Sequence, residues 1–133
     1  MDSKAGRRIV PPQAPHDEVL RTLADPTRRR LLQVLLAEEL NVSQLVTILA
    51  QPQSTISRHL KVLRDCGLVR DRRLGTTVFY QANQQALGDE DLRSVLLSWL
   101  SDQPLPRAVR DRLTKAVRQR GGDSVAFFEQ LGL

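Results

Sequence analysis

The stretch that decides the fold runs from Gln53 to Leu63 and reads Gln-Ser-Thr-Ile-Ser-Arg-His-Leu-Lys-Val-Leu. At 3.6 residues per turn, its apolar side chains Ile56, Leu60 and Leu63 share one helical face. The opposite face carries short hydrogen-bonding groups and cations without a carboxylate, namely Ser54, Thr55, Ser57, Arg58 and Lys61. Such a face is poorly suited to packing against protein and well suited to a DNA groove.

A second helix is predicted immediately before this one. Asn41 can cap its start, and its apolar stripe consists of Val42, Leu45, Val46 and Leu49. The connection Ala50-Gln51-Pro52 leaves room only for a tight turn, and the Gln53 helix ends near Gly67, a residue typical of helix C-termini. Two helices joined in this way form a helix-turn-helix.

The flanking segments predict two helices upstream and a hairpin downstream. A short amphipathic helix spans His16 to Ala24. Asp25 can cap a second helix, in which Pro26 suits the first position, and this helix is apolar nearly all round to about Glu38, as expected of a central core helix. After Gly67 the β-prone runs 68–73 and 76–81 flank Leu74-Gly75, which indicates a β-hairpin. A hairpin after a helix-turn-helix is a wing.

The remainder is predicted to be helical. A helix from Gln84 to Ser101 carries an apolar stripe of Leu92, Val95, Leu96, Trp99 and Leu100. Pro104 and Pro106 interrupt it, and a further helix runs from about Pro106 to Arg120. Gly121-Gly122 is expected to end that helix, before a last short one marked by Val125, Phe128 and Leu131. We therefore expect a mainly α winged helix-turn-helix fold, with a flexible arm over 1–15, a DNA-binding domain over 16–103 and a helical extension over 104–133.

Composition fits one small domain with a polyanionic partner. The chain has 133 residues, 41% of them hydrophobic, and a formal net charge of +5. Between Pro52 and Gly75 there are six cations against two carboxylates, and a concentrated basic segment points to nucleic acid. The single cysteine excludes an internal disulfide, and no apolar run suggests a signal peptide or a membrane span. We expect a cytoplasmic protein.

The predicted DNA contacts fall into two groups. Arg58 suits bidentate contact with guanine, and Gln53 can pair with adenine. The other helix residues suit phosphate contacts, and the hairpin-tip residues can reach the flanking groove or backbone. The full set is Gln53, Ser54, Thr55, Ser57, Arg58, His59, Lys61, Arg72, Arg73, Thr76 and Thr77. The alternative is a solvated basic helix beside a basic hairpin.

Four segments together resemble the ArsR/SmtB family of bacterial winged-helix repressors. They are Leu23-Ala24-Asp25-Pro26-Thr27-Arg28, Glu39-Leu40-Asn41-Val42-Ser43-Gln44-Leu45, Gln53–Leu63 and Gly67-Leu68-Val69. The resemblance implies a homodimer, an operator of inverted half-sites on double-stranded DNA, and release by an inducer. It also implies that the 16–103 domain carries a dimer interface at Val19, Leu20, Leu92, Val95, Leu96, Trp99 and Leu100. The alternative for these side chains is core within one chain, and we expect both roles.

The metal ligands usual in that family are missing. Where arsenic-type members carry cysteines, this chain has Asn41 and Ser43, and neither supplies a thiolate. The helix after the wing holds Asp89, Glu90, Asp91 and Asp102, but no histidine. We therefore predict no metal site and no cofactor. Cys66, at a helix end where the dipole disfavours a thiolate, is expected to be a partly buried small residue.

No catalytic constellation is recognisable, so we do not expect an enzyme. The tail from Arg107 to Phe128 is similar to the connector of a subgroup joined to an S-adenosylmethionine-dependent methyltransferase. Three hypotheses follow: a free-standing repressor, the regulatory part of a methyltransferase fusion, and a winged helix used for protein contact alone. A metal-responsive repressor with an atypical site is a further alternative. The subgroup resemblance favours a small organic inducer, such as S-adenosylhomocysteine, over a metal.

Overall fold

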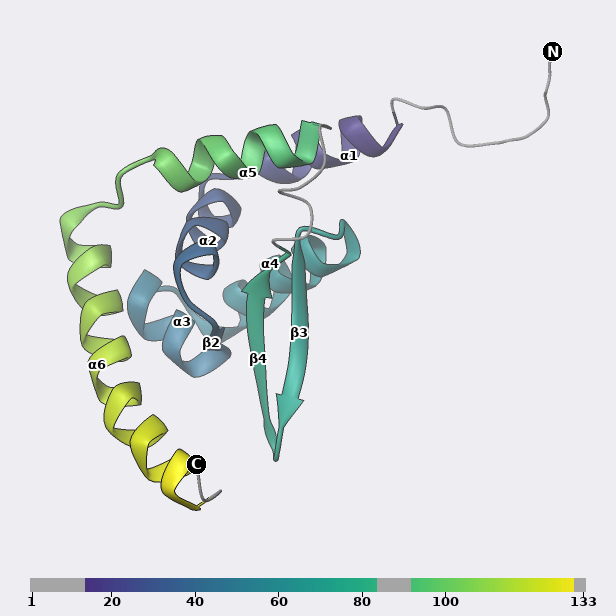
Figure 1. Cartoon of the computed structure of the whole chain (residues 1–133). Coiled ribbons are helices and arrows are strands. Elements are labelled where there is room, and N and C mark those ends of the chain that lie inside the picture. The colour runs from purple at the N-terminus through teal and green to yellow at the C-terminus, as the bar shows by residue number, and fades with distance from the viewer. Residues whose placement is uncertain (1–13, 84–91, 131–133) are drawn as a thin grey trace, which may run out of the picture.

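The computed structural model describes residues 14–83 and 92–130. The elements follow the order α1 (Ala14–Leu23), α2 (Pro26–Ala37), β2 (Leu40–Asn41), α3 (Val42–Leu49), α4 (Gln53–Asp65), β3 (Val69–Leu74), β4 (Thr77–Ala82), α5 (Leu92–Asp102) and α6 (Arg107–Gln130). Figure 1 shows α2 enclosed by the other helices, with the β3–β4 hairpin projecting from one side. The mainly α fold with a hairpin wing is confirmed.

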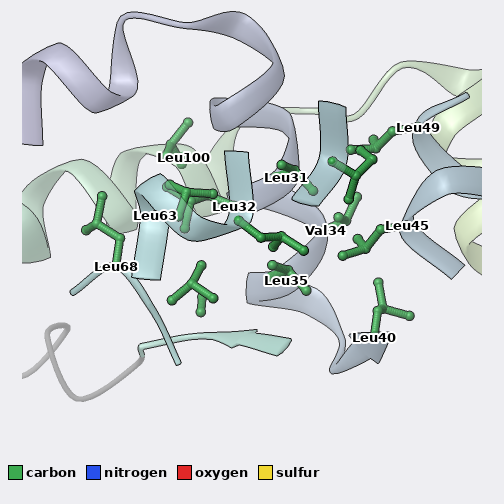
Figure 2. Packing of buried hydrophobic residues seen from close by; sticks show 14 of the residues in the cluster. Leu31, Leu32, Val34, Leu35, Leu40, Leu45, Leu49, Leu63, Leu68 and Leu100 are labelled. Atoms are coloured by element: carbon green, nitrogen blue, oxygen red, sulfur yellow. The ribbon is translucent and has the colours of Figure 1, made fainter. Parts of the chain in front are cut away.

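Helix α2 forms the centre of the core, as its all-round apolar sequence predicts. Asp25 caps it by accepting a hydrogen bond from the Arg28 backbone N–H at 3.0 Å, and Pro26 occupies the first turn. Its buried apolar residues are Leu31, Leu32, Val34 and Leu35. Figure 2 shows these side chains meeting leucines from several other elements. Complete burial of such side chains contributes roughly 1.5–3 kcal/mol each.

Helices α3 and α4 form the predicted helix-turn-helix. The α3 start is held by a reciprocal capping box, with the Gln44 N–H donating to Asn41 Oδ1 at 2.8 Å and the Asn41 N–H donating to Gln44 Oε1 at 2.9 Å. Ala50 ends α3 in the left-handed conformation, at φ 54°. The burial of Ile56, Leu60 and Leu63 then sets which face of α4 turns outward.

The wing belongs to an antiparallel three-stranded sheet of order β2-β4-β3. Val69 pairs with Ala82 at its base and Leu74 with Thr77 at its tip, where Gly75 takes φ +65°. The hairpin prediction is confirmed. Strand β2 was not predicted, because two residues show no alternation, and it is defined only by pairing Leu40 with Tyr80.

One predicted boundary in the tail is wrong. The expected helix end at Gly121-Gly122 and the separate last helix are replaced by one continuous helix, α6, to Gln130. A glycine inside a helix costs about 1 kcal/mol relative to alanine, which weakens a helix without ending it when no proline follows. The expected α5 start at Gln84 and residues 1–13 of the arm expected over 1–15 lie outside the described residues. The last two residues of that arm belong instead to α1, which begins at Ala14.

Helix α6 packs along α3 rather than standing apart (Figure 1). Val109 and Leu113 are buried in the core, and Arg112 Nε donates to the Ile48 carbonyl at 2.8 Å. Further along, Arg120 donates to the Glu39 carbonyl and to the Glu38 carboxylate. Across the described ranges, no helix combines the length and hydrophobicity needed to cross a bilayer.

Candidate nucleic-acid interface

The outer face of α4 is exposed and free of acidic side chains over its first three turns. Gln53, Ser54, Ser57, Arg58 and Lys61 are exposed. The helix has no acidic residue in its first turn, and its first carboxylate is Asp65, at the far end. The N-terminal half of α4 therefore presents hydrogen-bonding groups and a guanidinium to solvent. Thr55, which was predicted on this face, is half-buried at its edge.

His59 does not belong to this exposed face, which corrects its inclusion among the DNA contacts. Its side chain is 6% exposed. It follows Ile56 by three residues and precedes Leu63 by four, so the helical period places it with the apolar side chains. Its ring Nδ1 lies 3.4 Å from Arg28 Nη1. Burial lowers the pKa of His59, because the charged imidazolium loses hydration.

Arg28 is a residue of the site region that sequence reasoning passed over. Its Nε donates to the Thr22 carbonyl at 2.6 Å, and its Nη1 contacts His59. One guanidinium therefore connects the end of α1, the start of α2 and the buried side of α4. Because arginine only donates, the neutral Nδ1 of His59 must be the acceptor. Arg28 lies in the segment Asp25-Pro26-Thr27-Arg28, which predicts a helix start and carries part of the family resemblance, but neither pattern shows that Arg28 contacts α4.

The wing places Arg73 and Thr76 in solvent at its tip, with Thr77 half-buried beside them. Arg72 is exposed, but its guanidinium group is already paired with a carboxylate. Its Nε and Nη2 donate to the two carboxylate oxygens of Glu39, both at 2.6 Å, and its guanidinium carbon lies 5.9 Å from the centre of the Phe79 ring. The hydrogen bonds from Arg72 hold the pKa of Glu39 below its usual range.

Acidic neighbours also engage other cations of the segment. Lys61 pairs with Asp65 at 3.0 Å and Arg64 with Asp71 at 3.5 Å. By contrast, Arg58 and Arg73 form no ion pair with any residue that the structure describes. Arg70 on β3 is likewise exposed and without an ion pair among the described residues. These three guanidinium groups, one on α4 and two on the wing, are the cations of the segment most available to a polyanion.

The predicted interface residues of α1 and α5 separate into three sets. Val19 and Leu100 are each 2% exposed, so their burial is complete within one chain. Leu92 and Leu96 are half-buried. Leu20, Val95 and Trp99 are 50%, 60% and 51% exposed. These last three, the α1/α5 patch, leave a large apolar area uncovered, a feature that commonly marks an interaction site.

The residues that replace the expected metal ligands have other tasks. Asn41 uses its side chain in the capping box of α3. Within 14–83 and 92–130, no three His, Cys, Asp or Glu side chains gather closely enough to hold a metal ion. Cys66 is half-buried, and desolvation raises the pKa of its thiol, so the thiolate is disfavoured at neutral pH.

Comparisons with known proteins agree with this geometry. The family model described as bacterial regulatory protein, arsR family, matches residues 25–71. The arsenic resistance transcriptional regulator ArsR2 of Pseudomonas putida is 37% identical over 103 residues, which cover 73% of this chain and 85% of ArsR2. The transcriptional regulator KmtR of Mycobacterium tuberculosis is 43% identical over 68 residues, 51% of this chain, and the chain spans about half of KmtR, 52% of its length.

Solved structures show the same architecture. A homodimeric winged helix-turn-helix DNA-binding domain from Mycobacterium bovis superposes with a TM-score of 0.57 at 25% identity, over 72% of this chain and 85% of that domain. That domain is described as a possible ArsR-family transcriptional regulator.

Proposed function

Because the chain belongs to the ArsR family of bacterial regulatory proteins, we propose that it represses transcription by binding an operator as a homodimer. The observation that carries this proposal is the exposed outer face of α4, which has no carboxylate over its first three turns and lies beside the wing. A helix with this surface fits the major groove of B-form DNA, which is about 12 Å wide.

The side chains have distinct roles in this proposal. Arg58 reads guanine with two hydrogen bonds, and Gln53 contacts adenine. Ser54, Ser57 and Lys61 hold the helix against phosphates, which supply affinity without sequence information. Arg73 and Thr76 at the wing tip contact the backbone beside the groove.

The two-fold axis is proposed to run through the α1/α5 patch. Leu20, Val95 and Trp99 are apolar and exposed in the single chain, and the M. bovis domain with this architecture is a homodimer. A symmetric dimer requires inverted half-sites, with centres about 10–10.5 base pairs apart or a multiple of that spacing.

Control by a small organic molecule, without a metal, is the remaining part of the proposal. It is supported by the two positions at which arsenic-type members of the family carry cysteines. Here Asn41 caps α3 and Ser43 is an exposed hydroxyl, so neither position supplies a thiolate. We also propose that the protein acts in the cytoplasm, where its DNA is. The α6 helix is taken as part of the DNA-binding unit, since it packs on α3.

Selection of bound fragments from a random DNA pool, at a stated salt concentration, tests this function. The recovered site is then titrated with wild type, Arg58→Ala and the matched variant Arg110→Ala, which removes an exposed arginine from α6. Loss of a bidentate base contact costs about 1–3 kcal/mol, so Arg58→Ala should bind roughly 5- to 150-fold more weakly, with relaxed preference at one base pair.

Arg110→Ala should bind like wild type. Equal loss in both variants would show that only total charge matters and that Arg58 reads no base. Failure to enrich any sequence, or binding that does not weaken with salt, would refute the DNA-binding proposal itself, because phosphate contacts release counterions.

A further inference from the structure

A small cavity lies between the first half of α2 and the end of α5. Its volume is about 260 Å³. Pockets for drug-sized ligands span roughly 300–1,000 Å³, so this one suits a molecule of about one aromatic ring. Its polar and aromatic lining comes from Arg29, Arg30, Gln33, Trp99 and Gln103, and no carboxylate of the described chain lines it.

The two guanidinium groups of the cavity have only neutral partners. Arg29 Nη1 donates to the Leu23 carbonyl and Arg30 Nη1 donates to Gln33 Oε1, both at 2.7 Å. Neither forms an ion pair with a described residue. Since arginine has five N–H donors, each keeps donors for a ligand. The nearby acid, Asp25, faces Arg28 and His59 instead.

The floor of the cavity is held in place before any ligand arrives. Gln33 is 8% exposed. Its Nε2 donates to the carbonyls of Leu100 at 3.4 Å and Gln103 at 3.1 Å, while its Oε1 accepts from Arg30. The amide therefore fastens α2 to the end of α5 and orients Arg30. A preorganised donor loses little conformational entropy on binding.

Trp99 supplies the aromatic wall. Half of its surface is exposed. It is the only tryptophan in the chain, which has few aromatic residues to bury in its core. A flat ring can stack on the indole, while arginine pairs with a carboxylate through two parallel hydrogen bonds. A second cavity of about 230 Å³ shares Pro26 and Arg30 with the first and reaches Leu49 and Val109. Arg30 therefore borders both spaces.

We propose that this cavity binds a small aromatic carboxylate, with its ring against Trp99 and its carboxylate on Arg29 and Arg30. The acid must be compact, with one ring and one carboxylate, because of the cavity's volume. The site goes beyond the proposed DNA binding, because none of its residues lies on α4 or the wing, and it shares only Trp99 with the proposed α1/α5 dimer patch.

The single tryptophan makes the site directly observable. Its indole N–H gives one signal in a ¹⁵N-correlated NMR spectrum of the full chain in its own oligomeric state. We titrate that signal with benzoate, with benzamide, which has nearly the same shape without the charge, and with inorganic phosphate, which has charge without a ring. Benzoate should shift the signal saturably, and the other two should require at least tenfold higher concentration.

Paired variants locate the charge. Arg30→Gln should weaken benzoate binding at least tenfold, whereas Arg118→Gln, which removes an exposed arginine of α6 outside the cavity, should leave it unchanged. Should Arg30→Gln not fold by circular dichroism, Arg29→Gln takes its place.

Three results would overturn the proposal: no saturable shift with benzoate, an equal response to benzamide or phosphate, or equal loss in the cavity variant and Arg118→Gln. Because the readout is ligand binding by the DNA-free protein, each of these results leaves the operator proposal standing.

Discussion

At the scale of single residues, the contact between Arg28 and His59 links α4, the proposed DNA-reading helix, to the core. His59 sits on the buried side of α4, so the neutral ring is the form that fits beside Arg28 at 3.4 Å. A protonated ring would place two cations side by side in a partly desolvated place, which is costly. The contact with Arg28 and the burial of the ring therefore both favour the neutral form of His59.

A pH dependence of folding follows from this contact. Burial lowers the pKa of His59 below its ordinary value of 6.5, so the unfolded chain takes up a proton at a higher pH than the folded one. The free energy of unfolding should be constant above about pH 7.5 and should fall as the pH drops through 6.5. Urea unfolding at pH 8, 6.5 and 5.5 measures this.

His59→Gln is the control, because it removes the titrating group. Its stability should change less over the same range. The carboxyl groups of Asp25 and Glu39 contribute little change above pH 5.5. The stability linked to their lowered pKa values is lost only as the pH falls through their ordinary values of 3.8 and 4.5. A wild-type protein equally stable at pH 5.5 and pH 8 would contradict the role assigned to the ring.

The ion pair with Glu39 engages Arg72, one of the predicted DNA contacts of the wing. Both partners reach solvent, so the pair contributes only about 0.2–1 kcal/mol to folding. Glu39→Gln should release Arg72 for a phosphate contact. Binding to random duplex DNA should tighten, and the slope of log K against log salt should steepen by about 0.9, one phosphate contact.

The double variant Glu39→Gln with Arg72→Gln separates this effect from a change in overall charge. It should lose the added slope while keeping the fold. Weaker DNA binding by Glu39→Gln alone would show instead that Glu39 positions Arg72 for DNA rather than competing with it.

At the scale of elements, sequence periodicity predicted the helices and strands whose apolar residues lie on one face and repeat at regular spacing. Helix α4 and the hairpin were expected because their apolar residues repeat at the period of the element. Strand β2 and the packing of α6 were not, since both involve long-range contacts. Leu40 pairs with Tyr80, and Arg120 reaches back to Glu38 and Glu39.

The candidate site shows the same division. The exposed residues of α4 were predicted from the helical period, and the same period, applied to His59, would have placed it inside. The engagement of Arg72 was out of reach, because Glu39 lies 33 residues away in the chain. Sequence patterns show which side chains share a face, but they do not show which of them form ion pairs with residues far away in the chain.

The capping box of α3 should be worth a measurable part of the stability. Asn41→Ala removes the acceptor for the Gln44 N–H, and loss of such a cap costs about 0.5–2 kcal/mol. Urea unfolding should show this loss. Ser43→Ala, two residues on and exposed, should stay within about 0.5 kcal/mol of wild type. Equal stability of both variants would mean that packing alone holds the start of α3.

At the scale of the whole molecule, the proposed dimer and DNA surfaces lie apart. Helices α1 and α5 run side by side at one end, and the hairpin tip points to the other (Figure 1). Helix α2 lies between them, in contact with α1, α4 and α5. A dimer formed through α1 and α5 would therefore leave both copies of α4 and the wing uncovered, as an operator of two half-sites requires.

A charge placed in the α1/α5 patch tests this arrangement. Val95 is 60% exposed in the single chain, so Val95→Asp should leave the protomer folded while burying an uncompensated carboxylate in any interface formed there. Sedimentation velocity should show a dimer dissociation constant raised at least tenfold. Thr114→Asp, an exposed position on α6, is the matched control and should sediment as wild type does.

DNA binding then reports whether the two copies act together. If both half-sites must be held at once, Val95→Asp should lose much more affinity for the full operator than for a single half-site, because the linked second contact is lost. An unchanged dimer would place the two-fold axis elsewhere. A weakened dimer with full operator affinity would show that α4 and the wing of one protomer are enough to bind the operator.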